Sequence, residues 1–196
     1  MMKIVMLRHG QTYWNRAKKM QGKTDIPLNE IGKSQARRAA AAMPEVDLCL
    51  TSPLGRARQT AELALEGRNV PIVEEPLLLE QGYGLYEACS QRIGFHIPVH
   101  PLYNYTRRPE KYVPGLGGES FEDLYVRARK LLNERLLPME GSCGSVLLSA
   151  HGAILCAVYN CMFDVPVNRF WDSLLPNCGI RTVQVENGIF RPAADE

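Results

Sequence analysis

Two stretches of the chain end an apolar run with a histidine followed by a glycine. Near the N-terminus, IVMLRHG places Arg8 and His9 directly after four apolar residues, and VLLSAHG places His151 after a second run. A charged group at the end of a buried strand is costly unless it is paired. The pattern therefore indicates a ligand-binding site. The alternative for either histidine alone is a hydrogen bond to a loop that closes the end of the sheet.

A third stretch, TSPLGRARQT, predicts a helix that begins with Ser52 as N-cap and Pro53 in the first position. Arg56 lies in its first turn, where the helix N-terminus already attracts anions. Guanidinium groups bind phosphate oxygens in pairs, so Arg8 and Arg56 at one edge indicate a phosphoryl group as ligand. A surface ion pair is the alternative for Arg56, and it is the preferred interpretation for Arg58.

An acidic residue completes the set of candidate catalytic groups. Glu80, in LLLEQGYGLYE, follows an apolar run and precedes two glycines that allow close approach of the backbone. Such an acid suits a proton donor at the same edge of the sheet. A solvated loop glutamate is the alternative. Glu87 in the same stretch is predicted to be structural.

These candidates are spread over elements that alternate between strand-like and helical patterns. Strands are predicted at residues 3–7, 47–51, 70–74, 145–149 and 181–185, with a closing edge strand after a tight turn at ENGIF. The alternation predicts an α/β fold, a three-layer sandwich with a mostly parallel central sheet flanked by helices. Ligands bind at the carboxyl edge of such sheets, so we expect His9 and His151 to face one another there.

Other helices have clear start signals. Asn29 is a predicted N-cap, Ser120 and Asp123 form a predicted capping box, and the apolar stretch 152–163 predicts a buried helix. Proline and glycine repeatedly interrupt residues 88–118, which have no clear periodicity. We expect a single domain spanning residues 1–196 in which 88–118 form a small inserted cap.

Composition limits the classes of partner. With 23 basic and 21 acidic residues the net charge is +2 and the basic residues are scattered, so no nucleic-acid partner is expected. No apolar run reaches the roughly 20 residues that span a membrane. The start MMKIVML is too short for a signal peptide, and six cysteines without a CxxC pair suit reduced thiols. We therefore expect a cytoplasmic protein that does not bind membranes.

Taken in order, six motifs resemble the histidine phosphatase superfamily, in its phosphoglycerate mutase-like branch: LRHGQTYWN, QGKTDIPLNEIGKSQA, TSPLGRARQTA, LLEQGYG, GGESFEDLYVRA and LSAHG. The resemblance implies that His9 is the nucleophile and becomes phosphohistidine, and that Glu80 is the proton donor. It implies a phosphate pocket of Arg8, Arg56 and His151. Further residues are implied on the phosphate or substrate side: Asn15, Thr12, Gln21 and Gly22.

The chain departs from the family pattern at three places. Tyr86, Glu87 and Ala88 stand where the family often has Trp-Glu-Gly, so we expect a different floor of the entrance. Mutases of the family look longer, whereas this chain ends at FRPAADE soon after its last predicted strand, which favours hydrolysis. Arg107 and Arg108 nevertheless stand where mutases carry a basic pair for a second acidic group.

The sequence predicts a phosphatase that hydrolyses small phosphomonoesters through phosphohistidine, without a metal or other cofactor. A cofactor-dependent phosphoglycerate mutase is the alternative, and a non-catalytic phospholigand-binding module is a weaker one. A metal site of His9, His151 and Glu80 is disfavoured, because the neighbouring arginines would repel a cation. The oligomeric state is left open.

Overall fold

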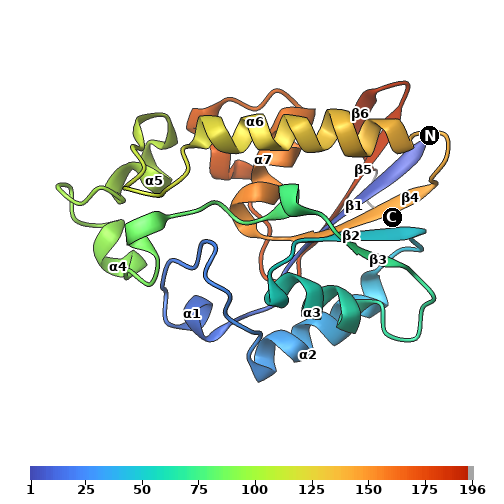
Figure 1. Cartoon of the computed structure of the whole chain (residues 1–196), viewed down its shortest axis with the longest axis horizontal. Helices are drawn as coiled ribbons and strands as arrows, with labels where there is room; N and C mark the ends of the chain where they lie inside the picture. Colours follow the sequence, from blue (N-terminus) through green and yellow to red (C-terminus); the bar gives the residue numbers. More distant parts are fainter. Residues whose placement is uncertain (194–196) are drawn as a thin grey trace.

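A six-stranded sheet forms the centre of the molecule (Figure 1), in a computed structural model that describes residues 1–193. Its strand order is β3-β2-β4-β1-β5-β6. The strands are β1 Met2–Arg8, β2 Leu48–Thr51, β3 Ile72–Glu74, β4 Ser145–Ala150, β5 Ile180–Glu186 and β6 Ile189–Pro192. The first four pair in parallel, and β5 and β6 are antiparallel additions at one side. The predicted mostly parallel sheet is confirmed.

Helices cover both faces of this sheet (Figure 1). On one face lie α2 Glu30–Ala39 and α3 Gly55–Ala64, and on the other lie α6 Phe121–Leu131 and α7 Gly152–Met162. Strand β1 serves both layers, because Val5 packs in the core cluster with Ala61 of α3 while Ile4 packs in the cluster with Leu124 of α6. Strands buried on both faces read as continuous apolar runs, which is why β1 and β4 show no alternation.

The predicted helix starts are correct in two cases and wrong in one. Asn29 caps α2 through its side chain, and Ser120 and Asp123 form the capping box of α6. Ser52 does not cap α3, which begins at Gly55 after Leu54 and has no side-chain cap. The hydroxyl of Ser52 instead accepts hydrogen bonds from Nε2 of His151, at 2.8 Å, and from the backbone N–H of Leu54, at 3.3 Å, both outside α3.

Shorter helices and 3₁₀ turns connect these elements. They are α1 Tyr13–Arg16, η1 Ala40–Ala42, η2 Pro76–Leu78, η3 Gly84–Tyr86, α4 Gln91–Gly94, α5 Tyr103–Arg107, η4 Pro109–Lys111, η6 Leu137–Met139 and η7 Val167–Ser173. A π-helical turn, η5 Leu132–Leu136, extends α6. No helix in the described part of the chain is both long and apolar enough to cross a bilayer.

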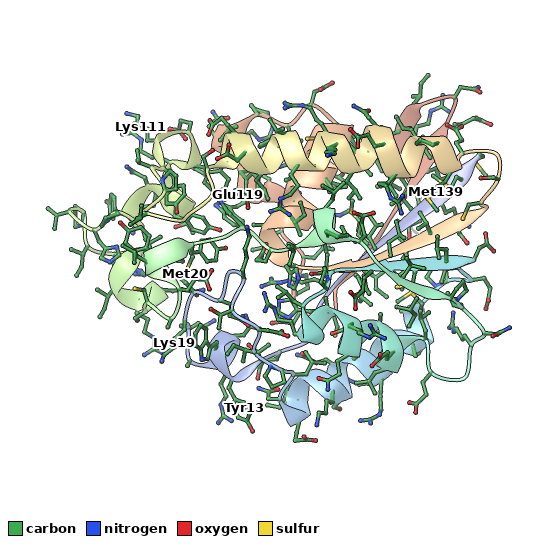
Figure 2. All side chains as sticks on the ribbon, in the orientation of Figure 1. Tyr13, Lys19, Met20, Lys111, Glu119 and Met139 are labelled. Carbon is green, nitrogen blue, oxygen red and sulfur yellow. The ribbon has the colours of Figure 1, made fainter. Side chains whose placement is uncertain are left out.

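The segment that carries α4 and α5 projects beyond the sheet (Figure 1). Its anchor is Tyr105, which is buried and whose ring contacts those of Phe95, Phe121 and Trp171. The first part of this segment also packs on the N-terminal loop, because Met20 donates its backbone N–H to Cys89, and Figure 2 shows Lys19 and Met20 on that side of the molecule. The segment is therefore attached mainly by aromatic packing.

The capping box of α6 can be tested directly by substitution of its N-cap residue. Ser120→Ala removes the acceptor for the backbone N–H of Asp123, so we expect a loss of about 0.5–2 kcal/mol in the free energy of unfolding. Urea denaturation followed by circular dichroism measures it. Ser34→Ala, in the middle of α2, is the matched control and should change stability little. Equal effects of the two substitutions would contradict the capping role.

Candidate active site

The structure brings the two histidines side by side at the carboxyl edge of the sheet. Strands β1 and β4 are parallel neighbours, with Arg8 in register with Ala150, so His9 and His151 follow at the same level. Their ring centroids are 5.1 Å apart with the ring planes inclined by 58°. Both side chains are buried. This is the arrangement that two parallel strands ending in His-Gly are expected to give.

His9 has one ring nitrogen free for chemistry. Its Nδ1 lies 2.7 Å from the carbonyl oxygen of Gly10, which can only accept, so Nδ1 carries the proton. The lone pair on Nε2 is therefore available as a nucleophile. Burial, followed by the positive charges of Arg56 and Arg8, holds the pKa of His9 well below its ordinary value of 6.5. The ring is thus kept neutral, which a nucleophile requires.

Arg56 is a fully buried guanidinium whose donors are held by main-chain acceptors. Its two terminal nitrogens donate to the carbonyl oxygens of Gly22, at 2.7 Å, and Thr24, at 2.8 Å. Its Nε donates to Nδ1 of His151 at 3.1 Å. Because that bond requires an unprotonated Nδ1, the proton of His151 lies on Nε2, which donates to the Ser52 hydroxyl at 2.8 Å.

The same environment keeps His151 neutral. Burial is the largest cause that lowers its pKa well below the ordinary value, and the charge of Arg56 is the next. His151 is not among the residues that line the cavity described below, and its contacts are to Arg56 and Ser52. In this position it contacts the guanidinium of Arg56 and the ring of His9, and its place in the phosphate pocket stays a prediction.

Arg8 brings a second guanidinium to the cavity with an unused donor. One terminal nitrogen donates to the carbonyl oxygen of Leu175 at 2.6 Å. Its Nε is buried and finds no acceptor among the described residues. A buried donor without a partner is costly, so an oxygen of a bound ligand would relieve that cost.

Glu80 lies at the N-terminus of α7 with its carboxylate facing backbone N–H groups. The carboxylate accepts from Ala153 and Ile154, each at 3.2 Å, and from Gln81 at 3.0 Å. The positive end of the helix dipole adds to this attraction. The side chain is largely buried and lines the same cavity as His9 and Arg8, so the acid predicted from sequence is placed at the predicted edge.

These groups surround a cavity of about 290 Å³. Its inner end is lined by Arg8, His9, Asn15, Gln21, Gly22, Arg56 and Glu80. Thr12, another residue singled out from sequence, does not line it. Thr12 caps α1 and its hydroxyl donates to the side chain of Gln21 at 2.9 Å, so it orients residues that do.

The outer wall of the cavity is largely aromatic and apolar. It includes Met20, Phe95, Tyr105, Trp171 and Leu174, with Lys19 the one cationic side chain among these outer residues. Polar atoms on the aromatic rings are already paired, since the hydroxyl of Tyr105 bonds that of Tyr83 at 2.6 Å and the indole N–H of Trp171 donates to the backbone of Tyr105. The wall therefore presents mainly the apolar parts of aromatic and aliphatic side chains.

The basic pair predicted for a second acidic group does not line the cavity. Arg107 donates its Nε to the carbonyl oxygen of Phe95 and lies over the ring of Tyr103. Arg108 extends to solvent, 4.0 Å from the carboxylate of Glu110. A segment without periodicity gives no indication of the direction in which a short helix turns its side chains, so binding of a second acidic group by this pair stays a prediction.

Sequence reasoning missed how the loop beneath Arg56 is held. Gly22 has φ +57°, and a Cβ on it would lie 2.2 Å from the carboxylate of Glu87. That carboxylate accepts the backbone N–H groups of Lys23 and Thr24, each at 2.9 Å. Glu87, predicted to be structural, thus fixes the two carbonyls that bind Arg56. In the sequence, the glycine at this turn is the only feature that could have indicated this role of Glu87.

No group of three or more His, Cys, Asp or Glu side chains suited to hold a metal ion occurs within residues 1–193. Independence of a metal stays a prediction, to be tested below by activity measurements.

An α/β sheet that brings two neutral histidines, two guanidiniums and a carboxylate together at one edge, with His9, both arginines and Glu80 lining one cavity, defines a phosphoryl-transfer site. The chain belongs to the histidine phosphatase superfamily, branch 1, whose family model matches residues 4–193. Its sequence is 36% identical to the uncharacterized phosphatase PhoE of Bacillus subtilis, over 79% of this chain and 74% of that protein.

Two further comparisons agree with this assignment. The 2,3-bisphosphoglycerate-dependent phosphoglycerate mutase 2 of Gloeobacter violaceus is 32% identical, over 79% of this chain and 73% of that protein. The solved structure of YhfR from Bacillus stearothermophilus superposes with a TM-score of 0.89 at 29% identity, covering all of this chain and 96% of that one.

The lowered pKa values predict how the site responds to acid. We expect the rings of His9 and His151 to stay unprotonated as pH falls through 6.5, whereas in the unfolded chain both bind protons there. The free energy of unfolding should therefore fall below pH 6.5, by up to about 1.4 kcal/mol per pH unit for each ring. NMR of ¹³C-labelled histidine, assigned with His9→Gln and His151→Gln, measures both titrations. A midpoint near 6.5 for either ring would contradict the proposed electrostatics.

Proposed function

We propose that the protein hydrolyses small phosphomonoesters in two steps, through a phosphohistidine on His9. The observation that carries this proposal is the free Nε2 of His9 in a cavity that also holds the unpaired Nε of Arg8. A nucleophile and an unused hydrogen-bond donor for an anion, in the same cavity, suit attack on a bound phosphoryl group. Membership of the histidine phosphatase superfamily supports the same chemistry.

In the first step Nε2 of His9 attacks phosphorus and the bond to the leaving oxygen breaks. Arg8 and Arg56 hold the non-bridging oxygens, where charge is concentrated in the transition state. Asn15, which lines the cavity beside them, adds a further amide donor. Glu80, protonated at this stage, gives its proton to the leaving oxygen, and the alcohol departs.

In the second step water attacks the phosphohistidine. The carboxylate of Glu80 accepts a proton from that water, the bond between Nε2 and phosphorus breaks, and inorganic phosphate leaves. His9 returns to its neutral form and Glu80 to its protonated form, so no metal, cofactor or external proton carrier is required. Gln21 and Gly22, at the same end of the cavity, line the path of the substrate.

We favour hydrolysis over mutase activity because of the outer wall of the cavity. A phosphoglycerate carries a second acidic group, which needs cationic partners. Lys19 is the one cation on that wall, and Arg107 and Arg108 are engaged outside it. The relative that is named a phosphoglycerate mutase keeps the alternative open to test.

Residues 88–118 form, in this proposal, the cap that selects the leaving group within a single-domain enzyme. Gln91, Phe95, Tyr105 and Thr106 of this segment line the cavity. Ring faces favour a compact aromatic or apolar leaving group over a charged one. We also propose a cytoplasmic location, because all six cysteines are unbridged, which suits a reducing compartment.

Substitution of the two central residues separates the two steps. His9→Ala should reduce turnover to background. Glu80→Gln keeps the shape but cannot donate or accept the proton, a contribution typically worth about 10²–10⁴-fold. With 4-nitrophenyl phosphate, whose leaving group needs little protonation, phosphoenzyme should accumulate on His9 and be visible by intact-protein mass spectrometry as an acid-labile adduct.

These assays are run in excess chelator, which also tests metal independence. Normal turnover by Glu80→Gln, or an adduct on another residue, would overturn the assigned roles. Loss of wild-type activity in chelator, restored by one divalent ion, would favour the metal-site alternative.

The cap residues predict a distinct pattern of substrate dependence. Phe95→Ala removes an aromatic ring from the wall. We expect KM for phenyl phosphate to rise about 10-fold, because the ring of the substrate then buries less apolar surface. Arg108→Ala should leave kcat/KM for both phenyl phosphate and 3-phosphoglycerate within about twofold of wild type, as expected for a surface ion pair. A loss confined to 3-phosphoglycerate in Arg108→Ala would restore the basic pair as a substrate-binding element.

A further inference from the structure

The motif GGESFEDLYVRA has no role in the mechanism above, yet it builds a tight ion pair. The guanidinium of Arg127 meets the carboxylate of Glu119 in a two-pronged contact, Nε to Oε1 at 2.9 Å and Nη2 to Oε2 at 2.7 Å. The two side chains are 16% and 14% exposed. Arg127 lies two turns into α6, and Figure 2 shows Glu119 where the chain enters that helix.

Arg127 uses its remaining donors on the chain segment that carries Glu80. One terminal nitrogen donates to the carbonyl oxygens of Leu77, at 3.0 Å, and Leu79. The other approaches the carbonyl oxygen of Glu80 itself at 3.4 Å. The guanidinium therefore binds the main chain up to and including the proton donor.

Glu119 holds the same segment from the other side of Glu80. Its backbone N–H donates to the carbonyl oxygen of Gly82 at 2.8 Å, and its carboxylate accepts the N–H of Gly82 at 3.3 Å. Its carbonyl oxygen accepts from the side-chain amide of Gln81 at 2.8 Å. Main-chain contacts thus fix the residues immediately before and after the proton donor.

Glu80 needs such an anchor because its own side-chain contacts change during the reaction. As a carboxylate it accepts N–H groups at the start of α7. As the protonated acid it accepts those bonds more weakly, since a neutral acceptor binds less strongly than a charged one. Contacts to the main chain, in contrast, do not change when the side chain gains or loses its proton.

We propose that Glu119 and Arg127 form a positioning pair that keeps Glu80 in line with the leaving oxygen in both of its protonation states. The inference rests on the function proposed above, in which Glu80 is the general acid and base. Neither residue lines the cavity, so both act through Glu80 and neither is a catalytic residue.

The chain offers a matched control for the loss of an ion pair. Arg135, in the π-helical turn that extends α6, donates to the carboxylate of Glu75 at 2.7 Å. This pair joins the same two parts of the chain, the helix and the segment after β3. Arg135 itself donates to no residue between 77 and 82, and its partner Glu75 accepts the backbone N–H of Leu77 at 3.0 Å. The side chain of Arg135 is 50% exposed, against 16% for Arg127. It therefore controls for the loss of an ion pair to this segment that does not reach Glu80.

The test is the dependence of kcat/KM on the leaving group. Phenyl phosphate needs protonation of its leaving oxygen more than 4-nitrophenyl phosphate does, and kcat/KM reports the phosphorylation step. For Arg127→Gln we expect the loss on phenyl phosphate to exceed that on 4-nitrophenyl phosphate by about 10-fold or more, within the 10²–10⁴-fold range of acid catalysis. Arg135→Gln should lose the same small factor on both substrates.

Three further variants connect the effect to Glu80. Arg127→Gln placed in the Glu80→Gln background should add no further leaving-group dependence, because the residue through which it acts is already disabled. Arg127→Lys and Glu119→Gln, which keep the volume of the pair, should show smaller losses with the same leaving-group dependence. They also give the answer if Arg127→Gln does not fold, as judged by circular dichroism.

The outcomes separate this inference from the proposed function. If Glu80→Gln shows the leaving-group dependence and the folded Arg127 and Glu119 variants lose activity equally on both substrates, the positioning role is wrong and the pair serves stability alone. If Glu80→Gln itself shows no such dependence, the acid role in the proposed function fails, and the positioning role fails with it.

Discussion

The site depends on one guanidinium that cannot reach water. An arginine does not lose its proton in a protein, so the burial of Arg56 must be offset by acceptors placed around it. The carbonyls of Gly22 and Thr24 supply them, and the loop that presents these carbonyls is tied in turn to Glu87. His151 receives the third donor and is thereby fixed in one tautomer. The positive charge is in place before any phosphoryl group arrives, which is the preorganisation that charge stabilisation requires.

The two ends of the cavity are lined by different kinds of side chain. At the inner end, backbone groups and one sheet edge set the positions of charged side chains. At the outer end, ring faces come from residues far apart in sequence, such as Phe95 and Trp171. The inner end therefore relies on hydrogen bonds to the main chain, whereas the outer end relies on aromatic packing that can be changed without altering those bonds.

Sequence reasoning worked where a residue's position follows from the topology of the sheet. Two apolar runs ending in His-Gly were enough to predict that His9 and His151 meet, because neighbouring parallel strands end at one edge. Sequence reasoning gives no direction for the side chains of a short helix, such as Arg107 and Arg108, whose role stays a prediction. It failed where partners compete for one group. Ser52 matches the pattern of an N-cap, but the imidazole of a histidine from a distant strand takes its hydroxyl instead. Rules based on local sequence do not include a hydrogen-bond partner that lies far away in the chain.

The strand order also has a consequence for synthesis of the chain. Strand β1 precedes the other strands in the chain, yet its two neighbours in the sheet, β4 and β5, are made only after β2 and β3. At about 5–20 residues per second, ribosomes need on the order of ten seconds between β1 and β4. During that interval the apolar β1 has neither of its native partners, so the nascent chain cannot close its central sheet until β4 and β5 have emerged. His9 is thus translated well before the strands that complete the sheet around it.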